Sequence, residues 1–322
     1  MSMRRGYPWH FLIGSVVGVL LLSVPSTGGA QGKVRIALAV PGAGVFSAIS
    51  AAEDLGFYRE NGVMAEVTAY RGGAAAQEAL VAGAADLFTG APLVVALAVK
   101  KGVKEKIVAV TQARPTGWHI MVIQDSPVRS FRDLAGKKVG ITVKGSATDY
   151  YALWAAAKAG VTIQTIPVGG GGIAPALKGK QVDAAVVFAP VSFRLMLAGE
   201  ARSLVDLGKE IESDVWSPLV ATQKFIDEQP DLLRRTLKAI YKATRHMQQN
   251  REYALKYLKA YTKEDDRVVE TDYEVVVKDL SPDGMIRREW LEASLALVKT
   301  TGITDLPKIE EFFTDRFIPV RD

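Results

Sequence analysis

Small polar residues follow several strands that the sequence predicts, and their types could hold a small anion. Ser146, Ala147 and Thr148 stand between a strand and a helix, and Thr89-Gly90 follows another strand. Backbone N–H groups at the start of a helix, together with Ser and Thr hydroxyls, bind carboxylate and sulfonate oxygens. We therefore expect these loops to form a binding site for an organic anion, although Ser, Thr and Gly also serve as ordinary helix caps.

The other candidate ligand contacts lie at strand ends or helix starts: Gly44, Ser47, Arg71, Gln112, His119, Phe188 and Pro190. Arg71 could hold an anion through two parallel hydrogen bonds, or it could simply face solvent. His119 could donate a hydrogen bond to a ligand, or it could pack where the chain passes between domains. Phe188 could line an apolar part of the pocket or fill the core.

The sequence argues against most catalytic and cofactor chemistry. There is no cysteine, and the three histidines, at positions 10, 119 and 246, show no metal-ligand spacing. The segment Gly169–Ala174 fits GxGxxA, but Pro175 follows at once and no acidic ribose partner stands in a clear position. No phosphate-binding loop and no GxSxG motif occur. We expect no metal, no cofactor and no enzymatic activity.

The elements that would position these loops alternate between strand and helix. From Leu55 to Pro92 the chain reads as helix end, strand, helix and strand, with Gly or polar turns between them. Such a βαβ order gives a parallel sheet, whose loops gather at the carboxyl ends of the strands. Beyond Ser217 the pattern changes to long amphipathic helices, beginning at Pro230.

Composition and charge place the chain among globular proteins. It has 322 residues, of which 48% are hydrophobic and 23% are charged, and its net charge is +5. Beyond residue 30, 38 Lys and Arg stand against 35 Asp and Glu, which leaves +3. This mild excess shows no basic stripe, so we expect no nucleic-acid partner.

Residues 1–30 are typical of a secretory signal peptide. Arg4 and Arg5 precede the apolar run Phe11–Val24, and Gly28 and Ala30 fit the small positions of a cleavage site. The run is shorter than the ~20 residues that a membrane span needs, so a retained anchor is the weaker alternative. We expect a periplasmic mature chain without membrane insertion.

Five segments, in order, resemble the periplasmic solute-binding proteins of ABC importers, in the nitrate/sulfonate/taurine group that also contains thiamine-precursor binding proteins. They are spread in the family's order over essentially the whole mature chain: Ala51–Val63, Gln77–Pro92, Ser130–Ser146, Ala176–Pro190 and Phe225–Arg235. The resemblance implies an α/β fold of type II, in which two lobes, each a mainly parallel sheet flanked by helices, are joined by two crossover strands at a hinge. We expect residues 31–116 and 217–322 to form one lobe and residues 117–216 to form the other.

The resemblance implies a function as well. We expect the chain to bind a small solute in the cleft, most simply a sulfonate or carboxylate, and to deliver it as a monomer to an ABC permease with its ATPase. Two alternatives stay open at this point. The chain could be a sensor subunit, or an enzyme on the same fold, since thiamine-pyrimidine synthases and desulfinases share it. Those enzymes rely on Cys- or His-centred motifs, from which this sequence departs.

Overall fold

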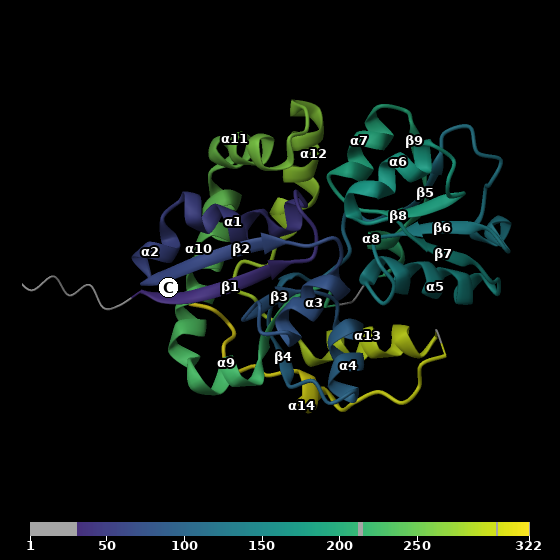
Figure 1. Cartoon of the computed structure of the whole chain (residues 1–322). Coiled ribbons are helices and arrows are strands. Elements are labelled where there is room, and N and C mark those ends of the chain that lie inside the picture. The colour runs from purple at the N-terminus through teal and green to yellow at the C-terminus, as the bar shows by residue number, and fades with distance from the viewer. Residues whose placement is uncertain (1–30, 212–214, 301, 322) are drawn as a thin grey trace, which may run out of the picture.

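The structure, a computed structural model, describes residues 31–211, 215–300 and 302–321. Two five-stranded sheets, each flanked by helices, stand beside each other as two lobes (Figure 1). The α/β fold with two lobes that the sequence predicts is therefore confirmed. The predicted signal peptide lies outside the described residues. Within the described part of the chain, no helix combines the length and the apolar character that a membrane crossing requires.

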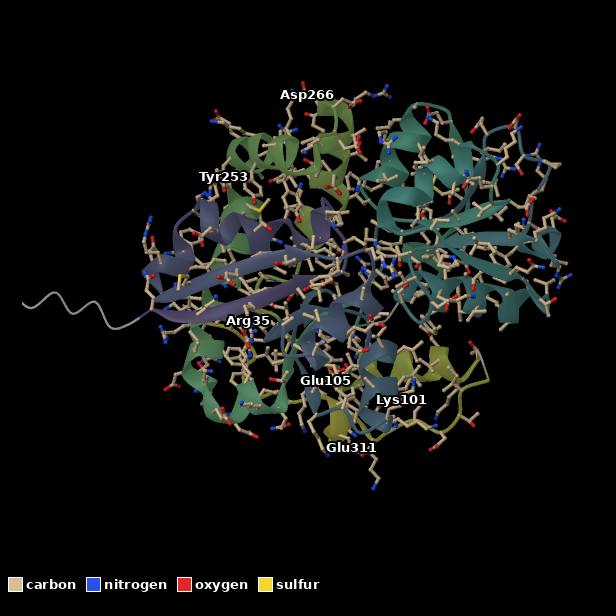
Figure 2. All side chains as sticks on the ribbon, viewed as in Figure 1. Arg35, Lys101, Glu105, Tyr253, Asp266 and Glu311 are labelled. Atoms are coloured by element: carbon tan, nitrogen blue, oxygen red, sulfur yellow. The ribbon has the colours of Figure 1, made fainter. Side chains whose placement is uncertain are left out.

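The sheet of lobe 1 has the strand order β2-β1-β3-β10-β4. Its inner strands are mostly apolar and buried, as expected for a sheet covered by helices on each side, although the first half of β1 carries Lys33 and Arg35. Their bounds are β1 Gly32–Leu38, β2 Val63–Ala69, β3 Leu87–Thr89, β4 Glu105–Gln112 and β10 Ser217–Thr222. Arg35 on β1 binds Asp86, next to β3, through Nε–Oδ2 and Nη2–Oδ1 hydrogen bonds of 3.1 and 2.7 Å (Figure 2).

The sheet of lobe 2 repeats this plan with the order β7-β6-β8-β5-β9. Its strands are β5 His119–Ile123, β6 Lys138–Ile141, β7 Gln164–Pro167, β8 Ala184–Val187 and β9 Ala201–Asp206. The sequence analysis did not predict β9, because this edge strand is only half-buried along most of its length and mixes polar with apolar residues. Its pairing with β5 is a tertiary contact with no local pattern of its own.

One strand in each sheet runs against the other four. These strands are β5, which is antiparallel to β8 and β9, and β10, which is antiparallel to β3 and β4. Each is the first strand after the chain has passed from one lobe to the other. Both sheets are thus mainly parallel, and the residues just before β5 and β10 lie at the two crossings between the lobes.

Helices cover both faces of each sheet, and the described α-helices after β10 belong to lobe 1 (Figure 1). The helices of lobe 1 are α1 Ser47–Asp54, α2 Phe57–Glu60, α3 Gly73–Val81, α4 Pro92–Lys100, α9 Gln223–Glu228, α10 Pro230–Gln249, α11 Arg251–Thr262, α12 Asp266–Val275, α13 Arg288–Lys299 and α14 Ile309–Phe312. Those of lobe 2 are α5 Ala147–Ala159, α6 Ile173–Lys178, α7 Val191–Leu197 and α8 Leu207–Glu210. Short 3-10 turns are η1 Gly44–Phe46, η2 Phe131–Leu134, η3 Gly170–Gly172 and η4 Val277–Asp279.

The two lobes touch directly. The Gly170 N–H of lobe 2 donates to the Arg71 carbonyl of lobe 1 at 3.2 Å. A Cβ atom on Gly72 would lie 2.6 Å from Val143 Cγ2, so this position needs glycine for the lobes to approach so closely. On the other side, Arg194 Nε of α7 binds the carboxylate of Glu264, between α11 and α12, at 3.0 Å. The lobes are therefore in a closed arrangement.

A buried carboxylate supports the loop between β1 and α1. Asp272 on α12 is fully buried, and neither of its carboxylate oxygens has a hydrogen-bond partner among the described residues. A Cβ atom on Gly44 would lie 2.1 Å from Asp272 Oδ2, so the loop and the carboxylate fit only because position 44 is glycine. Burial raises the pKa of Asp272 to about 7, and the negative charge of Glu264 adds to this effect.

This raised pKa predicts a pH-dependent stability. The folded protein holds the Asp272 proton more tightly than the unfolded chain, so the stabilisation is complete below the unfolded pKa, near 3.9, and is lost as the pH rises through about 7. We predict that Asp272→Asn increases the free energy of unfolding at pH 8 by up to about 4 kcal/mol, with little effect at pH 4.

Thermal unfolding of both proteins between pH 4 and pH 8 measures this difference. Asp266→Asn, at an exposed position of the same helix, is the matched control and should show no such trend. A difference between Asp272→Asn and the wild type that stays constant across the pH range would contradict the assignment.

Candidate functional site

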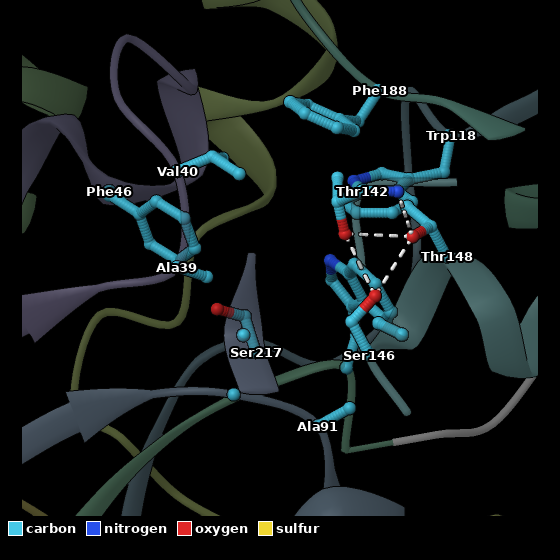
Figure 3. A pocket seen from close by; sticks show the side chains of 14 residues that line it. Ala39, Val40, Phe46, Ala91, Trp118, Thr142, Ser146, Thr148, Phe188 and Ser217 are labelled. Carbon is cyan, nitrogen blue, oxygen red and sulfur yellow. Dashed lines mark hydrogen bonds between the residues drawn. The ribbon is translucent and has the colours of Figure 1, made fainter. Parts of the chain in front are cut away.

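A cavity lies between the lobes, where the carboxyl ends of the strands meet the helix starts. Its volume, measured for the centres of water-sized molecules, is about 40 Å³, within about 420 Å³ of space free of protein atoms that includes open solvent. Lobe 1, lobe 2 and both crossings contribute to its wall (Figure 3). The lining residues are Ala39, Val40, Phe46, Gly73, Gly90, Ala91, Trp118, Thr142, Ser146, Ala147, Thr148, Phe188, Trp216 and Ser217.

Three hydroxyls form a compact cluster on the lobe 2 side of the cavity. Thr142 Oγ1 lies 2.8 Å from Ser146 Oγ and 2.9 Å from Thr148 Oγ1, and the Ser146 and Thr148 oxygens are 2.9 Å apart (Figure 3). Ser146 Oγ also lies 2.8 Å from the Val143 carbonyl, to which it can donate. These are four contacts, but the three hydroxyl groups carry only three protons. At any moment one of the four contacts therefore has no proton between its two oxygens. Because hydroxyls rotate freely, an anionic oxygen can compete for any of these protons.

The starts of three helices face the same cavity. Ala147 and Thr148 open α5, Gly73 opens α3, and Gly90-Ala91 precede α4. No side chain caps any of these three helices. Ser146 occupies the N-cap position of α5, yet its hydroxyl joins the cluster rather than the helix N–H groups. Ordinary capping therefore does not explain Ser146, and the free first-turn N–H groups, with the positive end of the helix dipole, favour an anion.

Two further donors in the cavity wall are buried and have no hydrogen-bond partner within the described part of the chain. They are Trp216 Nε1 and Ser217 Oγ, which follow one another at the return crossing into lobe 1. Leaving a buried polar group unpaired costs about 1–3 kcal/mol. Both atoms would be satisfied by an acceptor placed in the cavity, and this makes them the clearest sign of a binding site.

Aromatic side chains form the apolar part of the wall. Trp118, at the first crossing, stacks on Phe188 with ring centroids 4.8 Å apart and meets Trp216, at the second crossing, at 4.1 Å. Tyr151 of α5 supports Trp216 from behind at 5.1 Å. Phe46 closes the opposite side from lobe 1 (Figure 3). The two crossings and both lobes thus share one aromatic cluster around the cavity.

No Arg, Lys, His, Asp, Glu or Cys occurs among the fourteen described residues that line the cavity. These lining residues therefore offer no carboxylate that could pair with a cation, and the only side-chain nucleophiles among them are the hydroxyls of Ser and Thr. The arrangement instead suits a ligand with one anionic group and an apolar body. Neutral donors would hold the anionic group of such a ligand, and aromatic rings would contact its body.

The structure brings five of the twelve candidate ligand contacts into the cavity wall, namely Gly90, Ser146, Ala147, Thr148 and Phe188. Thr89 stands just behind the wall, where its Oγ1 accepts a hydrogen bond from the Ala39 N–H at 2.9 Å. Arg71 lies outside the cavity, in a groove that adjoins it and shares Thr142.

The remaining candidates are not among the residues that line the cavity. Gly44 packs on Asp272, and Ser47 Oγ donates to the Gly44 carbonyl at 2.6 Å. Gln112 Nε2 donates to Asp279 at 3.4 Å. His119 Nδ1 lies 3.0 Å from Ser203 Oγ, and burial lowers the pKa of His119. Pro190 follows Phe188 and Ala189 and precedes α7 without lining the cavity.

Sequence reasoning missed several residues of the wall, above all Thr142, Trp216 and Ser217. Thr142 directly follows the last residue of β6 and begins a polar loop, so the rule that ligands bind beyond the carboxyl ends of strands could have found it. No sequence pattern indicated that Trp216 and Ser217 bind a ligand, because they stand only at the predicted boundary between the two lobes. Trp118 and Trp216 both stand just before a reversed strand, and this feature appears only in three dimensions.

Known proteins share both the sequence family and the fold. A family model described as NMT1/THI5 like matches residues 44–254, which is more than half of the chain. A protein of Brucella abortus strain 2308 that is named as a binding protein is 25% identical over 264 residues, which cover 78% of this chain and 80% of that relative.

Among solved structures, one from Bordetella bronchiseptica RB50 has a TM-score of 0.79 at 25% identity and covers 90% of this chain and 96% of its own. The alkanesulfonate-binding protein SsuA from Xanthomonas axonopodis pv. citri, solved with MOPS bound, has a TM-score of 0.73 at 20% identity and covers 87% and 96%. The desulfurization enzyme DSZB has a TM-score of 0.63 at 15% identity and covers 89% and 97%. The last two likenesses concern the fold alone.

The resemblance that the sequence analysis drew from five segments is therefore confirmed for family and fold. The chain belongs to the NMT1/THI5-like family.

Proposed function

We propose that this protein binds a small organic anion, a sulfonate or a carboxylate with an apolar body, between its lobes and delivers it to the permease of an ABC importer. One observation carries the proposal. Unpaired buried donors, Trp216 Nε1 and Ser217 Oγ, line an uncharged cavity together with the hydroxyl cluster and the free start of α5. Ser217 belongs to lobe 1 and Ser146 to lobe 2, so one ligand would hold both lobes.

Closure follows from this division of the donors. With the lobes apart, each half of the cavity would face water, which satisfies its donors. With the lobes together, water is excluded and a ligand oxygen replaces it, so the ligand stabilises the closed state by its differential affinity. We propose that the lobes move about the two crossings, near residues 116–117 and 216–217, as in hinge closure around a ligand.

We further propose that the protein catalyses no reaction, acts as a monomer and works in the periplasm. The cavity wall, in the part of the chain that is described, offers no thiol, imidazole or carboxylate to a substrate. The predicted leader at residues 1–30 supports export. The likeness to an alkanesulfonate-binding protein supports transport, whereas the likeness to a desulfurization enzyme leaves turnover to be tested.

A thermal-shift screen of small acids tests the function directly. A ligand present at about 100 times its Kd stabilises the folded state by ~2.7 kcal/mol. We predict that aryl- and alkylsulfonates or the matching carboxylates raise the melting temperature, whereas amines of the same skeleton do not. Chromatography of the recovered ligand checks for turnover. Stabilisation by amines alone, or a transformed ligand, would contradict the proposal.

Ser146→Ala removes one hydroxyl of the cluster without removing a helix cap. A hydrogen bond to a charged group contributes about 1.5–3 kcal/mol, so we predict a roughly 10- to 100-fold weaker affinity for the anion found in the screen. Titration calorimetry measures the loss. The matched control, Thr271→Ala, removes the exposed α12 hydroxyl that donates to the Arg267 carbonyl and should leave affinity unchanged. Equal affinity of Ser146→Ala and the wild type would exclude this cluster from the site.

Ser217→Ala should weaken binding with little effect on the stability of the unliganded protein. With the lobes apart, water satisfies the Ser217 hydroxyl that has no described partner in the closed structure, so its removal relieves no penalty there. The same substitution removes a donor to the ligand and should weaken binding. Denaturant unfolding without ligand and calorimetry with ligand measure the two effects. A loss of stability without any loss of affinity would show that the Ser217 hydroxyl serves the fold and not the ligand.

A further inference from the structure

A second recess continues the cavity outward. This groove is lined by Pro41, Ala69, Tyr70 and Arg71 of lobe 1 and by Thr142, Val143, Lys144 and Pro167–Gly172 of lobe 2. Thr142 lines both the cavity and the groove, and Val40 of the cavity is followed by Pro41 of the groove. The groove therefore adjoins the cavity on the side of Thr142.

The charge of the groove differs from that of the cavity. Two cations face it, Arg71 from lobe 1 and Lys144 from lobe 2, and no acid is among its described lining residues. The Arg71 carbonyl is fixed by the Gly170 N–H, while its guanidinium forms no hydrogen bond or ion pair with any described residue. An exposed guanidinium with a fixed backbone can bind a carboxylate or sulfonate through two parallel N–H groups.

Lys144 is partly engaged. Its Nζ donates to Thr165 Oγ1 and lies 4.0 Å from Asp149 Oδ1. Asp149 is mostly buried, and its other oxygen accepts the Gly145 N–H at 2.9 Å. The Asp149 carboxylate thus offsets the charge of Lys144, while no acid that the structure describes offsets that of Arg71. The groove keeps an excess of about one positive charge, centred on Arg71.

The four consecutive glycines of lobe 2, Gly169–Gly172 (the glycine run), leave space beside the Arg71 guanidinium. A Cβ atom on Gly171 would meet no atom within 4 Å, so the run presents bare backbone to the groove. Gly170 is itself close to the cavity, since a Cβ atom there would lie 3.0 Å from Val40 Cγ1 and 3.8 Å from the Phe188 ring. The glycine run therefore lies between the aromatic wall of the cavity, near Gly170, and the groove beside Arg71.

We infer that the preferred ligand is an organic dianion. One anionic group lies among the inner donors at Ser146, Trp216 and Ser217, the apolar body contacts Phe46 and Phe188, and a second anionic group lies in the groove beside Arg71. This inference rests on the proposed function and narrows its ligand class. The outer group is bound between Arg71 of lobe 1 and the glycine run of lobe 2, so it also favours the closed state.

Matched pairs of ligands test the inference. Calorimetry compares benzenesulfonate with 3- and 4-sulfobenzoate, and propanesulfonate with 3-sulfopropanoate, on the wild type and on Arg71→Gln. We predict that at least one dianion binds about five- to tenfold more tightly than its monoanion, an advantage of ~1 kcal/mol as expected for a partly exposed charge pair. The advantage should shrink with added salt. In Arg71→Gln the ratio of the two affinities should fall to near one, and in Arg132→Gln, which changes an exposed arginine outside the groove, it should persist.

Two results would overturn the inference. One is equal affinity for every dianion and its monoanion in the wild type, and the other is a dianion advantage that survives in Arg71→Gln. Both leave the proposed function standing as long as the monoanions bind. Failure of every sulfonate and carboxylate to bind would instead refute the proposed function, and the inference with it.

Discussion

The need to satisfy buried hydrogen-bond donors is the constraint on which this account of the protein depends. Trp216 Nε1 and Ser217 Oγ are buried at a crossing between the lobes, beside three hydroxyls that have fewer protons than contacts. Apolar groups at this crossing would give a more stable interface between the lobes, because unpaired buried donors lower the stability of the folded state. Their presence is explained if an acceptor from outside the chain enters the cavity. The absence of charged residues from the described cavity wall then makes neutral donors and helix starts the means of holding an anion.

The fold explains why these donors come together. In each sheet one reversed strand follows the crossing, and inserting it between two parallel strands places Trp118 and Trp216 next to each other although they are far apart in the chain. The aromatic cluster at the crossings thus forms both part of the hinge and part of the wall. Close contacts at Gly72 and Gly170, where a side chain would collide, allow the lobes to shut over the site. In the proposed function, binding and closure would therefore depend on the same residues.

The sequence predicted what local patterns determine. The alternation of strands and helices and the helix start at Ser146–Thr148 follow from periodicity, Gly positions and turn residues. The two-lobed class came from the resemblance of five segments to a known family. It could not predict which face of a loop points into the cavity. Gly44 and Ser47 share a loop with Phe46, yet they face α12 and α10, because the buried Asp272 and Met247 pack there. Nor could it pair Trp216 and Ser217 with Ser146, since β10 brings them together only through antiparallel contacts with strands more than 100 residues earlier.

The most direct measurement is the indole N–H resonance of Trp216 in a ¹H–¹⁵N spectrum, assigned by comparison with Trp216→Phe and followed while benzenesulfonate is added. If an anion accepts a hydrogen bond from Trp216 Nε1, this resonance should move downfield to saturation, and the resonance of Trp290, on α13 and outside the cavity wall, should stay in place. A Trp216 resonance that does not move at saturating ligand would contradict the central claim that the buried donors between the lobes form the binding site.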